Sequence, residues 1–360
     1  MSFSLNLGMR FVVILIIWIT LPAMILAQYG FEYRQKLGFL IAHRSLMDHL
    51  PEAPAVAGEF SVVYQTQHEK SWHSAYRQPL VGATLFYGSV GNNSILGKFM
   101  GLYGSVELPI IKYKAYRMDF RFGTGVGYTN RPFDPILNPQ NVAIGSKINA
   151  MMCFAFKQSL RFANQGITLG IDMTHFSNAS FQMPNLGINV PYISLGVQHY
   201  FKQTNSSLQK ELSNKGPVSY GISGIFSAKE MRPVGVGRYP VYAMNFFGRR
   251  YFTPKFALEA SLDIIYKKGL LSHPSYPNAS PFDPLQIGFF IGYVQPFDRL
   301  HFIYGVGTYL RDVLRPDVPV YIRLGSRYAL TSKLEAMMTL KTHFAKADYM
   351  EFGLMYHLNQ

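Results

Sequence analysis

A histidine and a serine stand two positions apart near the end of a strongly alternating segment. From residue 167 to residue 174, apolar residues occupy every second position, and polar or small residues occupy the positions between them. This period of two predicts a β-strand with one apolar and one polar face. His175 and Ser177 continue the apolar positions. We therefore expect both side chains on one side of the strand, with Cβ atoms roughly 6–7 Å apart.

An imidazole at this spacing can act on the hydroxyl. Serine is a weak nucleophile at neutral pH, so it needs a base to take its proton. The pair would attack a carbonyl carbon, and the resulting oxyanion would need fixed hydrogen-bond donors. In a membrane barrel the apolar face points to lipid, which indicates a lipid substrate. A bare His-x-Ser pair carries little weight by itself, because most such pairs in strands are accidental.

The composition indicates an exported protein. Of 360 residues, 48% are hydrophobic and 15% aromatic, which suffices for one large domain or two medium ones. Residues 1–27 are predicted to be a secretory signal peptide, with Arg10 before an apolar stretch that ends near Ala27. The single cysteine, Cys153, excludes an intramolecular disulfide.

The net charge of +14 narrows the expected partners. The sequence contains no basic run, so nucleic acid is not an expected partner. Outer-membrane lipids and the phosphates of lipopolysaccharide suit a basic exported protein better. The histidines His43, His68, His73 and His199 are scattered without metal-ligand spacing and are expected in loops or at the membrane interface. We expect neither a metal nor an organic cofactor.

Short alternating segments recur after residue 28, with turn-rich loops between them. This pattern is typical of a transmembrane β-barrel, and we count about sixteen segments in two groups of about eight. The groups span 34–201 and 218–358. Arg117, Asp119 and Arg121 fall on a polar face and are expected to form ion pairs in a lumen. The predicted fold is all-β: a transmembrane antiparallel barrel protein, with two tandem eight-stranded barrels or one barrel of about sixteen strands.

A polar stretch divides the two groups and slightly favours two barrels. We therefore expect a signal peptide over 1–27, a first barrel domain over 28–202, a linker over 203–216, and a second barrel half of unassigned function over 217–360. If the amino-terminal end lies in the periplasm, the seventh strand, 166–177, runs outward. His175 and Ser177 would then lie at the depth of the outer leaflet.

The residues around the histidine and serine resemble a known family. His175-Phe-Ser177-Asn178-Ala179 is followed by Pro184-Asn185-Leu186-Gly187-Ile188-Asn189. This resembles the lipid A 3-O-deacylases and the related acyloxyacyl hydrolases, in which His-x-Ser-Asn precedes Asn-x-Gly-Ile and an acidic residue. The resemblance is specific in this stretch and looser over 38–202, and it does not extend to 217–360.

The resemblance implies a serine esterase of the cell outer membrane, which removes an ester-linked acyl chain from lipid A of lipopolysaccharide. Ser177 would be the nucleophile and His175 the base. Asn178 and the backbone amide of Ser180 would bind the oxyanion. Lipid A is the implied partner, and no cofactor is implied.

One position departs from the family. Asn189 stands where the family has its acidic triad member. An acid would fix the tautomer of His175 and stabilise the imidazolium, whereas an asparagine can orient the ring but carries no charge. Three interpretations stay open: a dyad supported by Asn189, an acid recruited from elsewhere such as Asp134, or a weak or inactive site. The alternative function is a non-enzymatic barrel, either a porin or a structural barrel with a decayed site.

Overall fold

The computed structural model describes residues 28–67, 70–201, 216–231, 234, 237–344 and 346–359. The expected signal peptide, nearly all of the expected linker, and His68 lie outside these residues. Within the described ranges, no helix is both long and apolar enough to cross a membrane.

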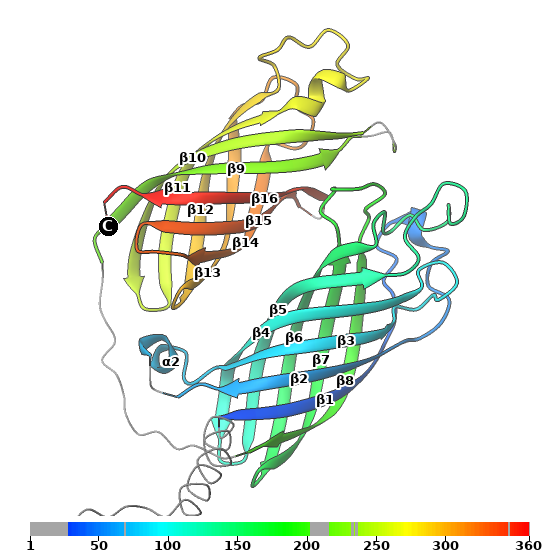
Figure 1. The fold of residues 1–360 in the computed structure, drawn as a ribbon, viewed down its shortest axis with the longest axis vertical. Helices are drawn as coiled ribbons and strands as arrows, with labels where there is room; N and C mark the ends of the chain where they lie inside the picture. The colour runs from blue at the N-terminus through cyan, green and yellow to red at the C-terminus, as the bar shows by residue number, and fades with distance from the viewer. Residues whose placement is uncertain are drawn as a thin grey trace, which may run out of the picture.

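Sixteen strands form two closed antiparallel barrels of eight strands each (Figure 1). The all-β prediction is confirmed, and the choice between one barrel and two is decided in favour of two. The first barrel contains β1 (Tyr29–Gly38), β2 (Ala55–Gln65), β3 (Leu80–Ser89), β4 (Lys98–Tyr113), β5 (Tyr116–Thr129), β6 (Ile148–Phe162), β7 (Gln165–Ser177) and β8 (Ile188–Tyr200). The second contains β9 (Val218–Glu230), β10 (Arg238–Thr253), β11 (Phe256–Lys267), β12 (Leu285–Phe297), β13 (Leu300–Arg311), β14 (Val320–Ala329), β15 (Leu334–His343) and β16 (Lys346–His357).

Each barrel closes by pairing its first strand with its last. β1 pairs antiparallel with β8, and β9 pairs with β16. Closure leaves no sheet edge with unpaired backbone groups. The described helices are short: α2 (Ser71–Ala75) and two single-turn segments, Ser45–Met47 and Lys268–Ser272.

The lumen of the first barrel is filled by paired charges and apolar side chains. Arg34 lies 2.8 Å from Asp172, and Lys157 lies 2.7 Å from Glu107. The ion pairs predicted for Arg117, Asp119 and Arg121 are confirmed, because Arg117 contacts Asp119 at 2.7 Å and Arg121 contacts Glu32 and Glu107. Toward the end of the barrel that carries the long loops, an apolar core takes over, with members that include Phe86, Phe99, Met151, Phe176 and Tyr192.

The two ends of the first barrel differ in loop length. At one end, called here the long-loop end, the strands are joined by segments 39–54, 130–147 and 178–187. At the other end, turns such as 114–115 and 163–164 suffice. β7 runs toward the long-loop end, so His175 and Ser177 lie close to the rim.

The barrels touch at both ends. At the short-turn end, Tyr76 stacks on Phe297 with ring centroids 4.5 Å apart, and midway along β5 the Phe122 ring lies 4.9 Å from that of Phe302. At the long-loop end, the loop after β7 reaches the ends of β9 and β16, which Figure 1 shows as the green loop beside the red hairpin. A site on the outer wall of β7 therefore faces the second barrel.

Candidate active site

The outward direction predicted for His175 is confirmed. Along β7, Ile167, Leu169 and Ile171 are exposed, whereas Thr168, Asp172 and Thr174 are buried in the lumen. His175 continues the outward positions, and Phe176 packs into the core of the lumen. Ser177 lines the same cavity as His175, outside the barrel wall.

A chain of hydrogen bonds joins Ser177, His175 and Asn189. Asn189 lies opposite His175 in the β7–β8 pairing, and its Oδ1 is 2.7 Å from His175 Nδ1. A carbonyl oxygen only accepts, so Nδ1 carries the proton. His175 Nε2 is then free to accept the Ser177 hydroxyl, whose Oγ lies 2.9 Å away. This tautomer, assigned from the network, leaves the imidazole ready to act as a general base.

His43, in the loop after β1, fixes which way the Asn189 amide points. Its Nε2 lies 3.1 Å from the Leu186 carbonyl and so donates to it. In the neutral ring Nδ1 is then an acceptor, and Asn189 Nδ2 donates to it at 3.3 Å. Because this Nδ1 carries no proton, its 3.4 Å contact with the Ile41 carbonyl is not a hydrogen bond. The Asn189 oxygen is thereby turned toward His175.

The residues expected to bind the oxyanion lie beside this chain. The Asn178 side-chain amide donates to Ser146 Oγ at 2.9 Å and to the Gln182 carbonyl at 2.8 Å, so its two hydrogens are already used. Ser180 lines the cavity with Ser177, and its hydroxyl donates to the Ala347 carbonyl of the second barrel. In the part of the chain that the structure describes, no acceptor meets the Ser180 N–H, which leaves it available to a ligand.

Asn185 is a further candidate oxyanion donor that our sequence analysis did not single out. It lines the cavity, and its Oδ1 accepts the backbone N–H of Asn178 at 2.9 Å. No acceptor among the described residues takes up its Nδ2, so this amide can donate to a ligand. The sequence signal for this role is the Asn185-Leu-Gly187 pattern that follows Ser177.

Asp134 does not contact His175. Its Oδ1 accepts the backbone N–H groups of Ile136 and Leu137, both at 2.8 Å. The hydrogen bonds from Leu137 and then from Ile136 hold the pKa of the Asp134 carboxyl below its usual value. This carboxylate organises its own loop, and the partner of His175 Nδ1 is Asn189.

The backbone at position 187 passes close to the His175 ring, which explains why this position is a glycine. Its φ of +80° is in the left-handed region, and a Cβ built there would stand 3.0 Å from His175 Cε1. A side chain at this position would be strained and would press on the His175 ring.

His175 and Ser177 open into a cavity of about 840 Å³ whose walls come from both barrels. Arg44, Leu46 and Leu186 line it from the first barrel. The second barrel contributes apolar and basic side chains, among them Tyr239, Leu270, Leu340, Phe344, Lys229 and Lys346. The apolar side chains of this cavity, with Arg44 beside them, suit a ligand with an acyl chain and an anionic group.

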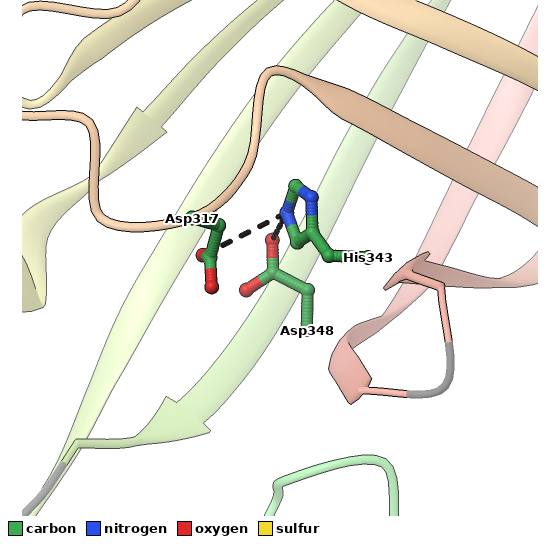
Figure 2. A group of neighbouring side chains, drawn as sticks. All are labelled: Asp317, His343 and Asp348. Carbon is green, nitrogen blue, oxygen red and sulfur yellow. Dashed lines mark hydrogen bonds and ion pairs between the residues drawn. The ribbon is translucent and has the colours of Figure 1, made fainter.

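A second cluster, in the mouth of the second barrel, gathers Asp317, His343 and Asp348 (Figure 2). His343 Nε2 is 3.3 Å from Asp348 and 3.6 Å from Asp317. Among the described residues, these three form the group whose ligand atoms lie close enough together to hold a metal ion. Lysines already neutralise both carboxylates. Lys267 contacts Asp348 at 2.7 Å, Lys346 contacts Asp317 at 2.7 Å, and Lys229 also binds Asp348. The cluster is an ion-pair network, and we assign no metal to it.

Comparisons with known proteins agree with the architecture. Residues 57–198 match the family model described as Lipid A 3-O-deacylase (PagL), and residues 218–360 match the one described as Acyloxyacyl hydrolase, C-terminal domain. The chain therefore belongs to the lipid A 3-O-deacylase and acyloxyacyl hydrolase family, a hydrolase family of β-barrels. The resemblance drawn from the motif is confirmed, and the match extends to the second barrel, where the sequence alone gave none.

Other comparisons add little. No curated protein matches the chain. Among solved structures, one described as "Asymmetric conductivity of engineered proteins" has 8% identity and a TM-score of 0.18, covering 92% of this chain and 99% of its own. A triple mutant of the Rhodopseudomonas blastica porin has 7% identity and a TM-score of 0.17 with the same coverage. At these scores the likeness carries no argument about function.

Proposed function

We propose that this protein is a serine esterase of the outer membrane that removes an ester-linked acyl chain from lipid A of lipopolysaccharide. The observation that carries the proposal is the 2.9 Å contact between His175 Nε2 and Ser177 Oγ on the outer wall of β7, with Asn189 behind the ring. Membership of the lipid A deacylase family supports the substrate class.

The acylation step follows from this geometry. Ser177 Oγ bonds to the ester carbonyl carbon while its proton passes to His175 Nε2. The carbonyl electrons move onto oxygen, where the Ser180 N–H and Asn185 Nδ2 donate to the oxyanion. Asn178 acts through Asn185. Its backbone N–H donates to Asn185 Oδ1 and so holds the Asn185 side chain in place. The bond to the sugar oxygen then breaks, and that oxygen takes the proton from His175.

Deacylation repeats the step with water. Water attacks the carbonyl carbon of the acyl-serine and gives its proton to His175 Nε2. The bond from the carbonyl carbon to Ser177 Oγ breaks, the serine recovers its proton, and a free fatty acid leaves. Asn189 keeps Nδ1 protonated throughout but offers no charge to the imidazolium. We therefore expect a slower enzyme than one with an acid at this position.

The outer surface supports a membrane setting. Leu169, Ile171, Ile193 and Leu195 on β7 and β8 point outward and are between 49% and 69% exposed. A belt of apolar side chains around closed barrels suits lipid. By barrel convention the long-loop end is extracellular, which brings Ser177 to the leaflet that holds lipopolysaccharide. Arg44 lines the cavity and would face its phosphates.

The alternative is a non-enzymatic barrel, of which the porin form is disfavoured by the charges and apolar side chains that fill the first lumen. The other form, a structural barrel with a decayed site, predicts that the wild-type protein leaves lipid A intact. Mass spectrometry of lipid A from cells that express wild type, Ser177→Ala or Ser94→Ala tests the proposal. Ser94 is an exposed serine at the same end of the barrel and serves as the matched control. Wild type and Ser94→Ala should remove one acyl mass, and Ser177→Ala none. Identical spectra for wild type and Ser177→Ala would contradict the proposal.

A further inference from the structure

The loop that follows the nucleophile, residues 178–183, is held by the second barrel. The Glu230 N–H, at the end of β9, donates to the Ser180 carbonyl at 3.0 Å. The Glu230 carboxylate accepts the Met183 N–H at 2.7 Å. The Ser180 hydroxyl donates to the Ala347 carbonyl of β16 at 3.0 Å. Glu230 thus makes two hydrogen bonds to the loop, and Ala347 makes a third hydrogen bond, to Ser180.

Arg238, at the start of β10, holds the outer part of the same loop. Its Nη2 donates to Gln182 Oε1 at 2.9 Å, and its guanidinium lies 4.5 Å from the centre of the Phe181 ring. Consecutive loop residues from 180 to 183 therefore each meet the second barrel through a backbone or side-chain group.

The loop has a conformation that needs such support. Ala179 and Ser180 have φ values of +52° and +63°, in the left-handed region that residues with a Cβ rarely adopt. Two such residues in succession persist only where the surroundings hold them, and such strain gathers at active sites. Inside the loop, the Phe181 N–H donates to the Asn178 carbonyl at 3.0 Å. The carbonyl and hydroxyl of Ser180 find their partners in the second barrel.

We propose that the second barrel is a positioning element for the active site, and that Glu230 is its main positioning residue. The Ser180 carbonyl accepts the Glu230 N–H and its hydroxyl donates to the Ala347 carbonyl, so Ser180 is held beside Ser177 in the wall of the cavity, and its N–H has no acceptor among the described residues. The proposal rests on the proposed function, because it assigns the held N–H to the oxyanion. It gives the second barrel a role in catalysis although its own His343 lies in an ion-pair network with Asp317 and Asp348.

Kinetics of the full-length protein test the proposal. Glu230→Ala removes the acceptor for Met183, and we expect kcat for lipid A deacylation to fall roughly tenfold with KM nearly unchanged, because a loosened oxyanion donor acts on the transition state. Glu230→Gln keeps an oxygen that can accept the Met183 N–H, and it should restore most of the activity. Asp283→Ala is the matched control, since Asp283 also accepts a backbone N–H in the second barrel, that of Ser280 at 2.8 Å, and no hydrogen bond among the described residues joins Asp283 to residues 178–183.

Heat-modifiable mobility in gels checks that both barrels of each variant are assembled. Arg238→Ala gives a second test on an exposed residue whose loss should not affect folding, and we expect a smaller fall in kcat. Wild-type kcat in assembled Glu230→Ala would overturn the proposal, as would a fall in Asp283→Ala equal to that in Glu230→Ala.

Covalent labelling separates this proposal from the substrate assignment. A p-nitrophenyl alkylphosphonate forms a Ser177 Oγ–phosphorus bond with loss of p-nitrophenolate, and its tetrahedral product also needs the oxyanion donors. Slower labelling of Glu230→Ala supports the positioning role even if wild type leaves lipid A intact, in which case the substrate assignment alone fails. Equal labelling rates in wild type and Glu230→Ala overturn the positioning role, and no labelling of wild type overturns both.

Discussion

Asn189 faces His175 across the β7–β8 pairing, and its side-chain oxygen accepts the imidazole Nδ1–H at 2.7 Å. An amide thus occupies the position from which the family's acid would act. It supplies the orienting half of the acid's role and omits the charge.

Restoring the charge should make the enzyme faster. In Asn189→Asp, a carboxylate of the same shape can accept the His175 Nδ1–H and stabilise the imidazolium, so we expect kcat to rise on the order of tenfold. Asn189→Ala loses the orienting bond as well and should fall below wild type. Initial rates on purified lipid A measure all three. An Asn189→Asp rate at or below that of wild type would mean that a charge at this position does not help the reaction.

His43 should matter through Asn189, although it does not touch His175 by any hydrogen bond. In His43→Phe the acceptor for Asn189 Nδ2 is lost, so the amide can turn its nitrogen toward His175 and favour the wrong tautomer. We expect kcat to fall by roughly tenfold, a fraction of what loss of the triad orientation costs. His43→Gln can present an oxygen to Asn189 and should recover activity. Equal losses in both variants would instead indicate a packing role, which circular dichroism and heat-modifiable mobility would reveal.

Gly187→Ala should disturb the His175 ring directly. Its Cβ would stand 3.0 Å from His175 Cε1 in a backbone with φ of +80°, so either the ring or the loop must move. We expect kcat to fall by about tenfold or more, because small displacements of catalytic groups are costly. Gly237→Ala is the control: its φ is +117°, but nothing lies within 4 Å of the added Cβ. A similar loss of activity in both variants would attribute the effect to backbone strain rather than to the contact with His175.

The alternation of apolar and polar residues predicted most of the fold, because it indicates which side chains of a strand face lipid and which face the lumen. It placed His175 on the outer wall and Arg117, Asp119 and Arg121 in the lumen. It could not count barrels, because closure depends on which strand pairs with β1, and the alternation within a strand does not state its partner. The two family models now assign 57–198 and 218–360 to one family.

The parts of the candidate site that escaped prediction come from loops. His43 is 146 residues from Asn189 and reaches it because the loop after β1 folds over the end of β8. Glu230 meets Met183 from another barrel. Neither His43 nor Glu230 belongs to a sequence motif that predicts its contact. The alternation within a strand predicts side-chain direction, but it does not predict loop conformation.

The grip of Glu230 on Ser180 and Met183 also constrains how the gene can change. On the proposed positioning role, a substitution at the end of β9 would act on the loop of the other barrel. We therefore expect the end of β9 and residues 180–183 to vary together among related chains, even though Glu230 need not touch the reacting atoms.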